Sequence, residues 1–127
     1  ELWQPENELP DSTVFEHPWK EGQRVEVHES FAQWLKSWRS SWESGSLLLV
    51  DYGAGCPEVY ARRPLGTLRA YARHQRLDGL EALQGFGRRD LTADVNFSDL
   101  QRWAVALGLT PGKPQTLRTF IQEQGIK

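Results

Sequence analysis

The fold is decided at residues 47–53, which read Leu47-Leu48-Leu49-Val50-Asp51-Tyr52-Gly53. Residues 47–50 form a continuous apolar run that follows a turn signal at residues 44–46. This pattern is typical of a strand buried on both faces, as in a parallel sheet. The run ends in an acid, an aromatic residue and a glycine, and open α/β sheets bind their ligands at such strand ends. The sequence therefore predicts an α/β fold with a site beside Asp51.

The segments around this strand alternate between helical and extended patterns. Apolar residues recur at helical spacing from residue 30 to about residue 43, and Ser98 and Gly108 bracket a second helix over residues 99–107. A short third helix is expected at residues 117–124. Short strands are expected at residues 2–4, 13–15, 24–27 and 91–97, with a strand or turn at 109–112. This order favours α/β but supplies too few strands for a complete doubly wound sheet.

Residues 53–89 are predicted to be a long irregular insertion within a single domain, residues 1–127. Glycines and prolines punctuate the segment, and its many arginines against few acids make it locally basic. A loop of this length inside a compact domain is usually functional or disordered.

Composition narrows the classes of function. A net charge of −2 over 127 residues gives no case for nucleic acid or an anionic membrane, and no apolar run approaches the roughly 20 residues of a membrane span. The single cysteine, Cys56, excludes an internal disulfide and favours a reducing compartment, which we expect to be the cytoplasm. The acidic, polar residues 1–21 do not resemble a signal peptide.

Two groups of residues form the candidate site. Asp51 can orient a hydroxyl, amine or guanidinium, although an ordinary Asp turn is favoured about two to one on this tripeptide alone. The second group lies in the loop at residues 66–74, which brings backbone N–H groups, a guanidinium, a phenol and an imidazole together. These groups could hold a carboxylate or phosphate, or shape a peptide pocket. A solvated basic loop with its tyrosine in the core fits the residues equally well. The binding candidates are Tyr52, Gly53, Gly66, Thr67, Arg69, Tyr71 and His74.

Two further features have competing structural explanations. Asp90 and Asp94 lie four residues apart in a predicted strand and therefore share a face. They could form a small acidic site, but a role as ion-pair partners of the loop arginines is favoured. The stripe of Trp34, Trp38 and Trp42 on one helix face is more often core than a binding platform. If half of the domain were missing, this stripe would be free to mediate self-association.

Several common site types are absent from the sequence. Neither His74 nor Cys56 has a second ligand at zinc-binding spacing, so no metal site is predicted. Gly53-Ala54-Gly55 follows a strand but does not open an amphipathic helix, so it is not a cofactor loop of the dinucleotide or S-adenosylmethionine (SAM) type. The chain has no nucleophile elbow and no phosphate-binding P-loop.

Five blocks in order resemble the MidA family of SAM-dependent methyltransferases. They are residues 22–27, Trp34, residues 48–53, residues 66–71 with His74, and residues 90–97, followed by Gly108-Leu109 and a tail at Phe120, Gly125 and Ile126. The chain departs from the family pattern at three positions. The family usually has His at Asp94, Asp at Asn96, and Gln at Leu117 after Thr116.

The resemblance implies that the chain is the C-terminal half of a Rossmann-like methyltransferase with a seven-stranded sheet. SAM would be bound mainly by the N-terminal half, outside these residues. The mitochondrial members are complex I assembly factors that methylate protein arginines, so the resemblance implies a protein substrate and arginine as the acceptor. Paired carboxylates match the donors of a guanidinium, and Asp51 and Glu26 are the catalytic candidates.

Two other functional hypotheses compete with the methyltransferase hypothesis. The chain could be a non-enzymatic protein-interaction module that uses the basic loop at 62–89 and the Trp-rich helix. A nucleic-acid binder is the weaker alternative, because few aromatics lie among the arginines and the chain is acidic overall.

Overall fold

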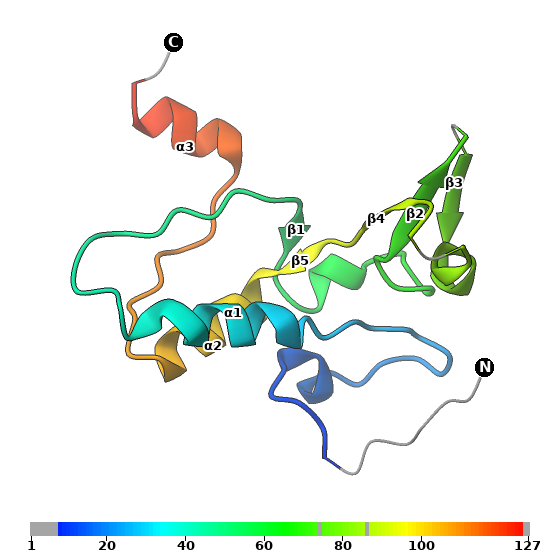
Figure 1. Cartoon of the computed structure of the whole chain (residues 1–127), viewed down its shortest axis with the longest axis horizontal. Helices are drawn as coiled ribbons and strands as arrows, with labels where there is room; N and C mark the ends of the chain where they lie inside the picture. Colours follow the sequence, from blue (N-terminus) through cyan, green and yellow to red (C-terminus); the bar gives the residue numbers. More distant parts are fainter. Residues whose placement is uncertain (1–7, 74, 86, 126–127) are drawn as a thin grey trace.

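The computed structural model describes residues 8–73, 75–85 and 87–125. It is a mixed α/β structure, as the sequence predicted, with two small sheets and three α-helices in the described part (Figure 1). The elements, with η denoting 3₁₀-helix, are η1 (Thr13–Glu16), α1 (Glu29–Arg39), β1 (Gly53–Ala54), η2 (Glu58–Tyr60), β2 (Arg69–Ala72), β3 (Gln75–Asp78), η3 (Gly79–Leu83), β4 (Asp90–Thr92), β5 (Val95–Asn96), α2 (Phe97–Ala106) and α3 (Leu117–Glu123).

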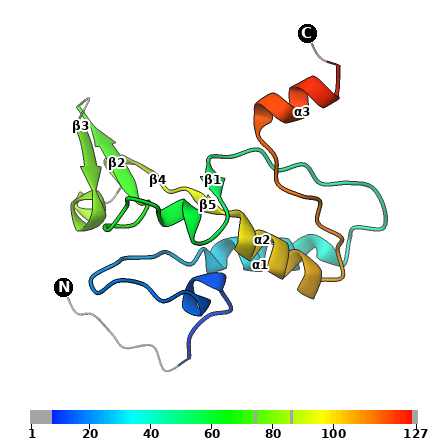
Figure 2. The ribbon, with the colours of Figure 1, turned by 180° about the vertical axis from the view of Figure 1, so that it is seen from behind.

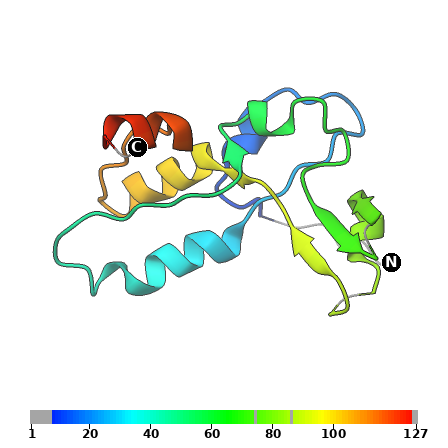
Figure 3. The same cartoon turned by 90° about the horizontal axis from the view of Figure 1, so that it is seen from above.

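The main body pairs α1 with α2 beside a short parallel ladder. Seen from above, the two helices lie side by side (Figure 3). Their apolar faces enclose one cluster of buried side chains: Leu35, Val95, Leu100 and Trp103. Strand β1 pairs with β5 in parallel, with Gly53 opposite Val95. A second cluster around Val14, Val59 and Tyr60 shares its neighbour Val27 with the first, so the two cores are continuous.

The predicted irregular insertion is largely ordered, which corrects the sequence-based expectation. Residues 53–89 contain β1, η2, β2, β3 and η3, and β2 lies between β3 and β4 in a three-stranded antiparallel sheet. This sheet projects from the main body as an arm (Figures 1 and 2). Ala70 is fully buried on one face of β2, whereas Tyr71 is 47% exposed on the other. The alternation of one covered and one open face explains why β2 forms a strand.

The predicted buried strand at residues 47–50 is the main error. No ladder forms there, and Leu48 and Val50 are each 62% exposed. A strand needs hydrogen-bonding neighbours, and no described segment pairs with these residues. Their sequence is suited to a sheet, but the described part of the chain supplies no strand beside them.

Other element boundaries also differ. Residues 13–15 form η1 rather than a strand, because the side chain of Ser12 caps it by accepting from the Val14 N–H. Residues 24–27 are extended without a ladder, and 91–97 divide into β4, β5 and the start of α2. Helix α1 ends four residues early, at Arg39, and α2 is capped by Asn96 rather than Ser98. Helix α3 is confirmed to within one residue, and the predicted strand at residues 2–4 lies outside the described residues.

A buried carboxylate fixes the N-terminal segment to α2. Asp99, 1% exposed, accepts hydrogen bonds from the Ser12 hydroxyl at 2.6 Å and from both the N–H and the hydroxyl of Thr13 at 2.7 Å. Asn96 donates to the same Thr13 hydroxyl at 3.1 Å. A buried carboxylate is tolerated only when its oxygens are satisfied, and these donors do so. The segment therefore forms part of the core rather than a loose tail.

Candidate functional site

The candidate site is built around Asp94, which lies in the break between β4 and β5. Its Oδ1 accepts from Arg69 Nη1 at 2.7 Å, and its Oδ2 pairs with Arg63. Burial alone would raise the pKa of Asp94, but the hydrogen bonds from the two guanidinium groups outweigh it and hold that pKa below its usual value. The same hydrogen bond to Asp94 raises the pKa of the Arg69 guanidinium. Asp94 is thus an ion-pair partner of the loop arginines, as the sequence favoured. Asp90, predicted to share its strand face and its role, forms no ion pair among the described residues, and β4 ends at Thr92, before Asp94.

A second carboxylate, Glu26, holds the start of the loop. Its Oε1 accepts from the N–H groups of Thr67 at 2.8 Å and Leu68 at 3.1 Å, and its Oε2 accepts from the Thr67 hydroxyl at 3.2 Å. Gly66 makes this approach possible: it has φ +82°, and a Cβ there would lie 2.1 Å from Glu26 Oε1. Glu26, Gly66 and Thr67, which sequence analysis assigned to the same site from separate segments, are therefore in contact.

The backbone of Glu26 is also anchored. The Tyr60 hydroxyl donates to the Glu26 carbonyl at 2.9 Å and accepts from the Glu26 N–H at 3.1 Å. Burial of the Tyr60 ring raises the pKa of its hydroxyl, so the phenol stays protonated and keeps its donor. The Glu26 carboxylate is consequently held in place by fixed groups on both its main chain and its side chain.

Residues 51–53, which lead into β1, join this network through two consecutive N–H groups. The Asp94 N–H donates to the Thr67 hydroxyl at 3.0 Å, and the Val95 N–H donates to the Tyr52 carbonyl at 2.8 Å. Gly53 is required because a Cβ would lie 2.1 Å from the Val95 carbonyl oxygen. Both groups of predicted site residues therefore meet at Asp94-Val95.

The side chains of Asp51 and Tyr52 point to solvent. The Tyr52 side chain is 78% exposed, and Asp51 is exposed with one carboxylate oxygen accepting its neighbour's N–H at 2.7 Å. Within the described residues, no ion pair or hydrogen bond links Asp51 to Glu26. The two proposed acids thus belong to different surroundings, one solvated and one held by the loop.

Tyr71 stands on the open face of the arm. It lies opposite Arg76 in β3 and Asp90 in β4. Arg76 pairs with Asp78 on the same strand at 2.8 Å. The alternative that placed this tyrosine in the core is therefore wrong, and His74 lies outside the described residues.

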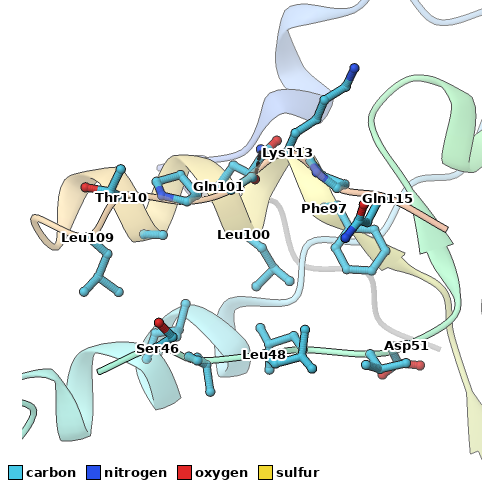
Figure 4. Close-up of a pocket in the computed structure, with 18 of the residues that line it drawn as sticks. Ser46, Leu48, Asp51, Phe97, Leu100, Gln101, Leu109, Thr110, Lys113 and Gln115 are labelled. Carbon is cyan, nitrogen blue, oxygen red and sulfur yellow. Dashed lines mark hydrogen bonds between the residues drawn. The ribbon is translucent and has the colours of Figure 1, made fainter. Parts of the chain in front are cut away.

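A cavity of about 950 Å³ opens beside the main body (Figure 4). One wall is the exposed apolar segment 46–51, and the other is the extended segment 109–115. Its floor includes Leu35, Phe97 and Leu100. The sequence did not indicate this groove, because residues 47–50 were expected to be covered.

The tryptophan stripe forms a ladder along α1 and just beyond it. Successive ring centroids lie 5.2 Å apart from Trp34 to Trp38 and 5.3 Å apart from Trp38 to Trp42. Trp38 packs against the main cluster, whereas Trp34 is 43% exposed. The stripe is therefore partly core and partly surface.

Comparison with known proteins identifies the family. The family described as putative S-adenosyl-L-methionine-dependent methyltransferase matches residues 3–115. The chain belongs to this family. This finding confirms the predicted resemblance to SAM-dependent methyltransferases.

Two curated relatives illustrate the similarity to this methyltransferase family. The mitochondrial protein arginine methyltransferase NDUFAF7 of Danio rerio is 38% identical over 84 residues, covering 66% of this chain and 18% of the relative. Its Rattus norvegicus counterpart is 39% identical over 82 residues, covering 65% of this chain and 16% of the relative. The chain thus spans less than a fifth of the length of these relatives. No solved structure matches it.

The family implies SAM, but the described residues do not fit a complete SAM site. Strand β5 passes directly into α2 without a glycine turn, and the side chain of Asn96 already accepts from the Ser98 N–H at the helix start. Strand β1 leads into η2, which has only three residues. No cluster of three or more potential metal ligands occurs among residues 8–73, 75–85 and 87–125, and no helix there is long and apolar enough to cross a membrane.

Sequence reasoning missed two members of this site. Arg63 was passed over because a single arginine in a basic loop carries no pairing signal. Tyr60 lies in a predicted loop, where nothing in the sequence indicated that its ring is buried or that it bonds Glu26. Asp94 was recognised as an ion-pair partner but not as the residue that joins the two groups.

Proposed function

We propose that the chain is the C-terminal, substrate-side portion of a SAM-dependent protein methyltransferase directed at arginine. Membership of the methyltransferase family and the printed activity of the NDUFAF7 relatives support this proposal. The observation that carries it is the junction at Asp94-Val95, which holds the Tyr52 backbone and the Thr67 side chain through consecutive N–H groups. SAM, bound mainly by residues outside this chain, would supply the methyl group.

The chain's own residues would receive and orient the acceptor. Asp51 is the carboxylate that can accept a substrate guanidinium, because it is exposed and one of its oxygens bonds only the adjacent N–H. Glu26 already accepts three hydrogen bonds, so we assign it the positioning of the Gly66-Thr67 turn beside the acceptor. Tyr52 would supply an aromatic face for the guanidinium. Accurate alignment of the acceptor nitrogen would be the main contribution to rate.

Calorimetry with SAM tests the cofactor part of this proposal. We expect no binding by the 127-residue chain and binding by a longer protein expressed from the same gene. Binding by neither would overturn the enzyme proposal and favour a protein-interaction module. For the acceptor part, Asp51→Asn in the longer protein should reduce methyl transfer to arginine peptides while leaving SAM affinity unchanged; Glu8→Gln, in an exposed position away from the site, is the matched control.

A further inference from the structure

Asp94 holds two positive charges next to the proposed acceptor site. Its Oδ1 accepts from Arg69 at 2.7 Å, and its Oδ2 pairs with Arg63. The N–H of the next residue along the chain donates to the Tyr52 carbonyl at 2.8 Å. Tyr52 directly follows Asp51, the carboxylate proposed to accept a substrate guanidinium. One backbone hydrogen bond therefore connects the residue after Asp94 to the residues proposed to bind the acceptor.

The side chains of Arg63, Asp94 and Arg69, here called the charge cluster, carry two positive charges and one negative charge. The Asp94 and Arg69 side chains are mostly buried, whereas the Arg63 side chain is half-buried and open to solvent. The Arg69 guanidinium also donates to the Thr67 carbonyl at 3.1 Å, so it keeps an acceptor when Asp94 loses its charge. The positive charge of Arg69 would consequently stay in place without the carboxylate.

An arginine acceptor brings a further guanidinium to this region. Like charges repel, and in about 0.1 M salt this repulsion extends over a screening length of about 10 Å. Asp94 cancels one of the two positive charges that the acceptor meets beside Asp51. If Asp94 were neutral, the acceptor would meet two uncompensated guanidinium groups, because arginine stays protonated in proteins.

We propose that Asp94 is a positioning residue for the methyl acceptor, acting through Arg63 and Arg69 by cancelling part of their positive charge. This role rests on the proposed function, because only a cationic acceptor would be sensitive to that charge. Repulsion of the acceptor weakens its binding in the ground state and in the transition state alike. Loss of the Asp94 charge should therefore raise KM for the acceptor peptide and leave kcat nearly unchanged.

Four versions of the longer protein expressed from the same gene test this role. Arg63→Gln brings the net charge of the cluster to zero, the unmodified protein has +1, and Asp94→Asn gives +2. The double variant Asp94→Asn/Arg63→Gln returns the cluster to +1. At low salt, KM for an arginine peptide should rise by about threefold for each added unit of charge, with the double variant close to the unmodified protein. Raising the salt to about 0.5 M should shrink these differences, because screening shortens the range of the repulsion.

Unfolding in urea separates this electrostatic role from a purely structural one. Asp94→Asn and the double variant with Arg63→Gln should both be less stable than the unmodified protein, because each has lost the two ion pairs of Asp94. Only Asp94→Asn should have a raised KM. Arg76→Gln removes the same charge from an exposed ion pair on β3, so it is the matched control and should leave KM unchanged. SAM affinity should be the same in all the variants.

The outcomes distinguish this role from the proposed function itself. If the unmodified protein methylates arginine peptides but KM follows stability rather than charge, the electrostatic role of Asp94 is wrong and the proposed function stands. Equal KM values in all four versions would overturn that role in the same way. If the unmodified longer protein methylates no arginine peptide, the proposed function is wrong and the role of Asp94 falls with it.

Discussion

Removing the Asp94 carboxylate should cost the combined contribution of two ion pairs, and removing each arginine in turn should separate them. Asp94→Ala deletes both ion pairs but keeps the backbone N–H that donates to Thr67, so the change isolates the side chain. The Arg69 and Asp94 side chains are 14% and 9% exposed, whereas the Arg63 side chain is 41% exposed. The Arg69–Asp94 pair is more buried than the Arg63–Asp94 pair, so it should contribute more to the free energy of unfolding.

The magnitudes follow from burial. Breaking a buried pair by removing one partner costs about 3–5 kcal/mol, and a solvent-exposed pair contributes about 1 kcal/mol or less. Because Arg69 keeps some access to water, we expect Asp94→Ala to lower the free energy of unfolding by about 3 kcal/mol. Arg63→Ala should cost less than about 1 kcal/mol. Arg69→Ala should cost nearly as much as Asp94→Ala, since it leaves the carboxylate buried.

Urea unfolding, followed by the fluorescence of the six tryptophans, measures these differences. The double variant Arg69→Ala/Asp94→Ala should cost about 4 kcal/mol, because a coupling energy of about 2 kcal/mol is subtracted from the sum of the two single costs. An Asp94→Ala variant within about 0.5 kcal/mol of the unmodified chain would show that the two ion pairs do not stabilise the fold. Equal costs for Arg63→Ala and Arg69→Ala would refute the argument from burial.

Three further predictions concern single residues of the same region. Gly66→Ala should destabilise the chain by about 2 kcal/mol or more in the urea assay, because of its positive φ and the clash with Glu26, whereas Gly112→Ala, with open space around it, should be nearly neutral. Since the pKa of Asp94 is lowered on folding, its stabilising effect should be complete above the unfolded pKa near 4 and lost as pH falls through the folded pKa. In urea titrations, the difference in unfolding free energy between the unmodified chain and Asp94→Asn should therefore stay constant above about pH 5 and shrink below about pH 4. A difference that does not change with pH would contradict this. Burial raises the pKa of the Cys56 thiol, so iodoacetamide at pH 8 should modify it more slowly in the folded chain than in urea, and equal rates would show that the thiol is not shielded.

Helical periodicity predicted the three α-helices because each carries its own local signal. The arm was missed for an equally local reason. Its β2–β3 hairpin turns at Arg73 with φ 49°, a conformation usually signalled by Gly, Asn or Asp, and arginine gives no such signal. The run at 47–50 was misjudged because strand character is recognisable from sequence, but the presence of a neighbouring strand is not.

The sequence predicted many of the residues of the site but not the contacts between them. Glu26 and Thr67 were selected from blocks 41 residues apart, and only the fold shows that one holds the other. Asp94 was interpreted correctly as an ion-pair partner because the acid faces an arginine-rich loop. Its role in joining strand end and loop depends on a backbone N–H, which every residue has and which no sequence pattern marks.

Methyl transfer measured directly would test the central proposal. The assay is the incorporation of labelled methyl groups from SAM into arginine-containing peptides by the longer protein expressed from this gene, with and without Asp51→Asn. We expect methylated arginine that is strongly reduced by Asp51→Asn while SAM binding persists. Label on another residue type, or undiminished transfer by Asp51→Asn, would contradict the assignment of this region to an arginine acceptor.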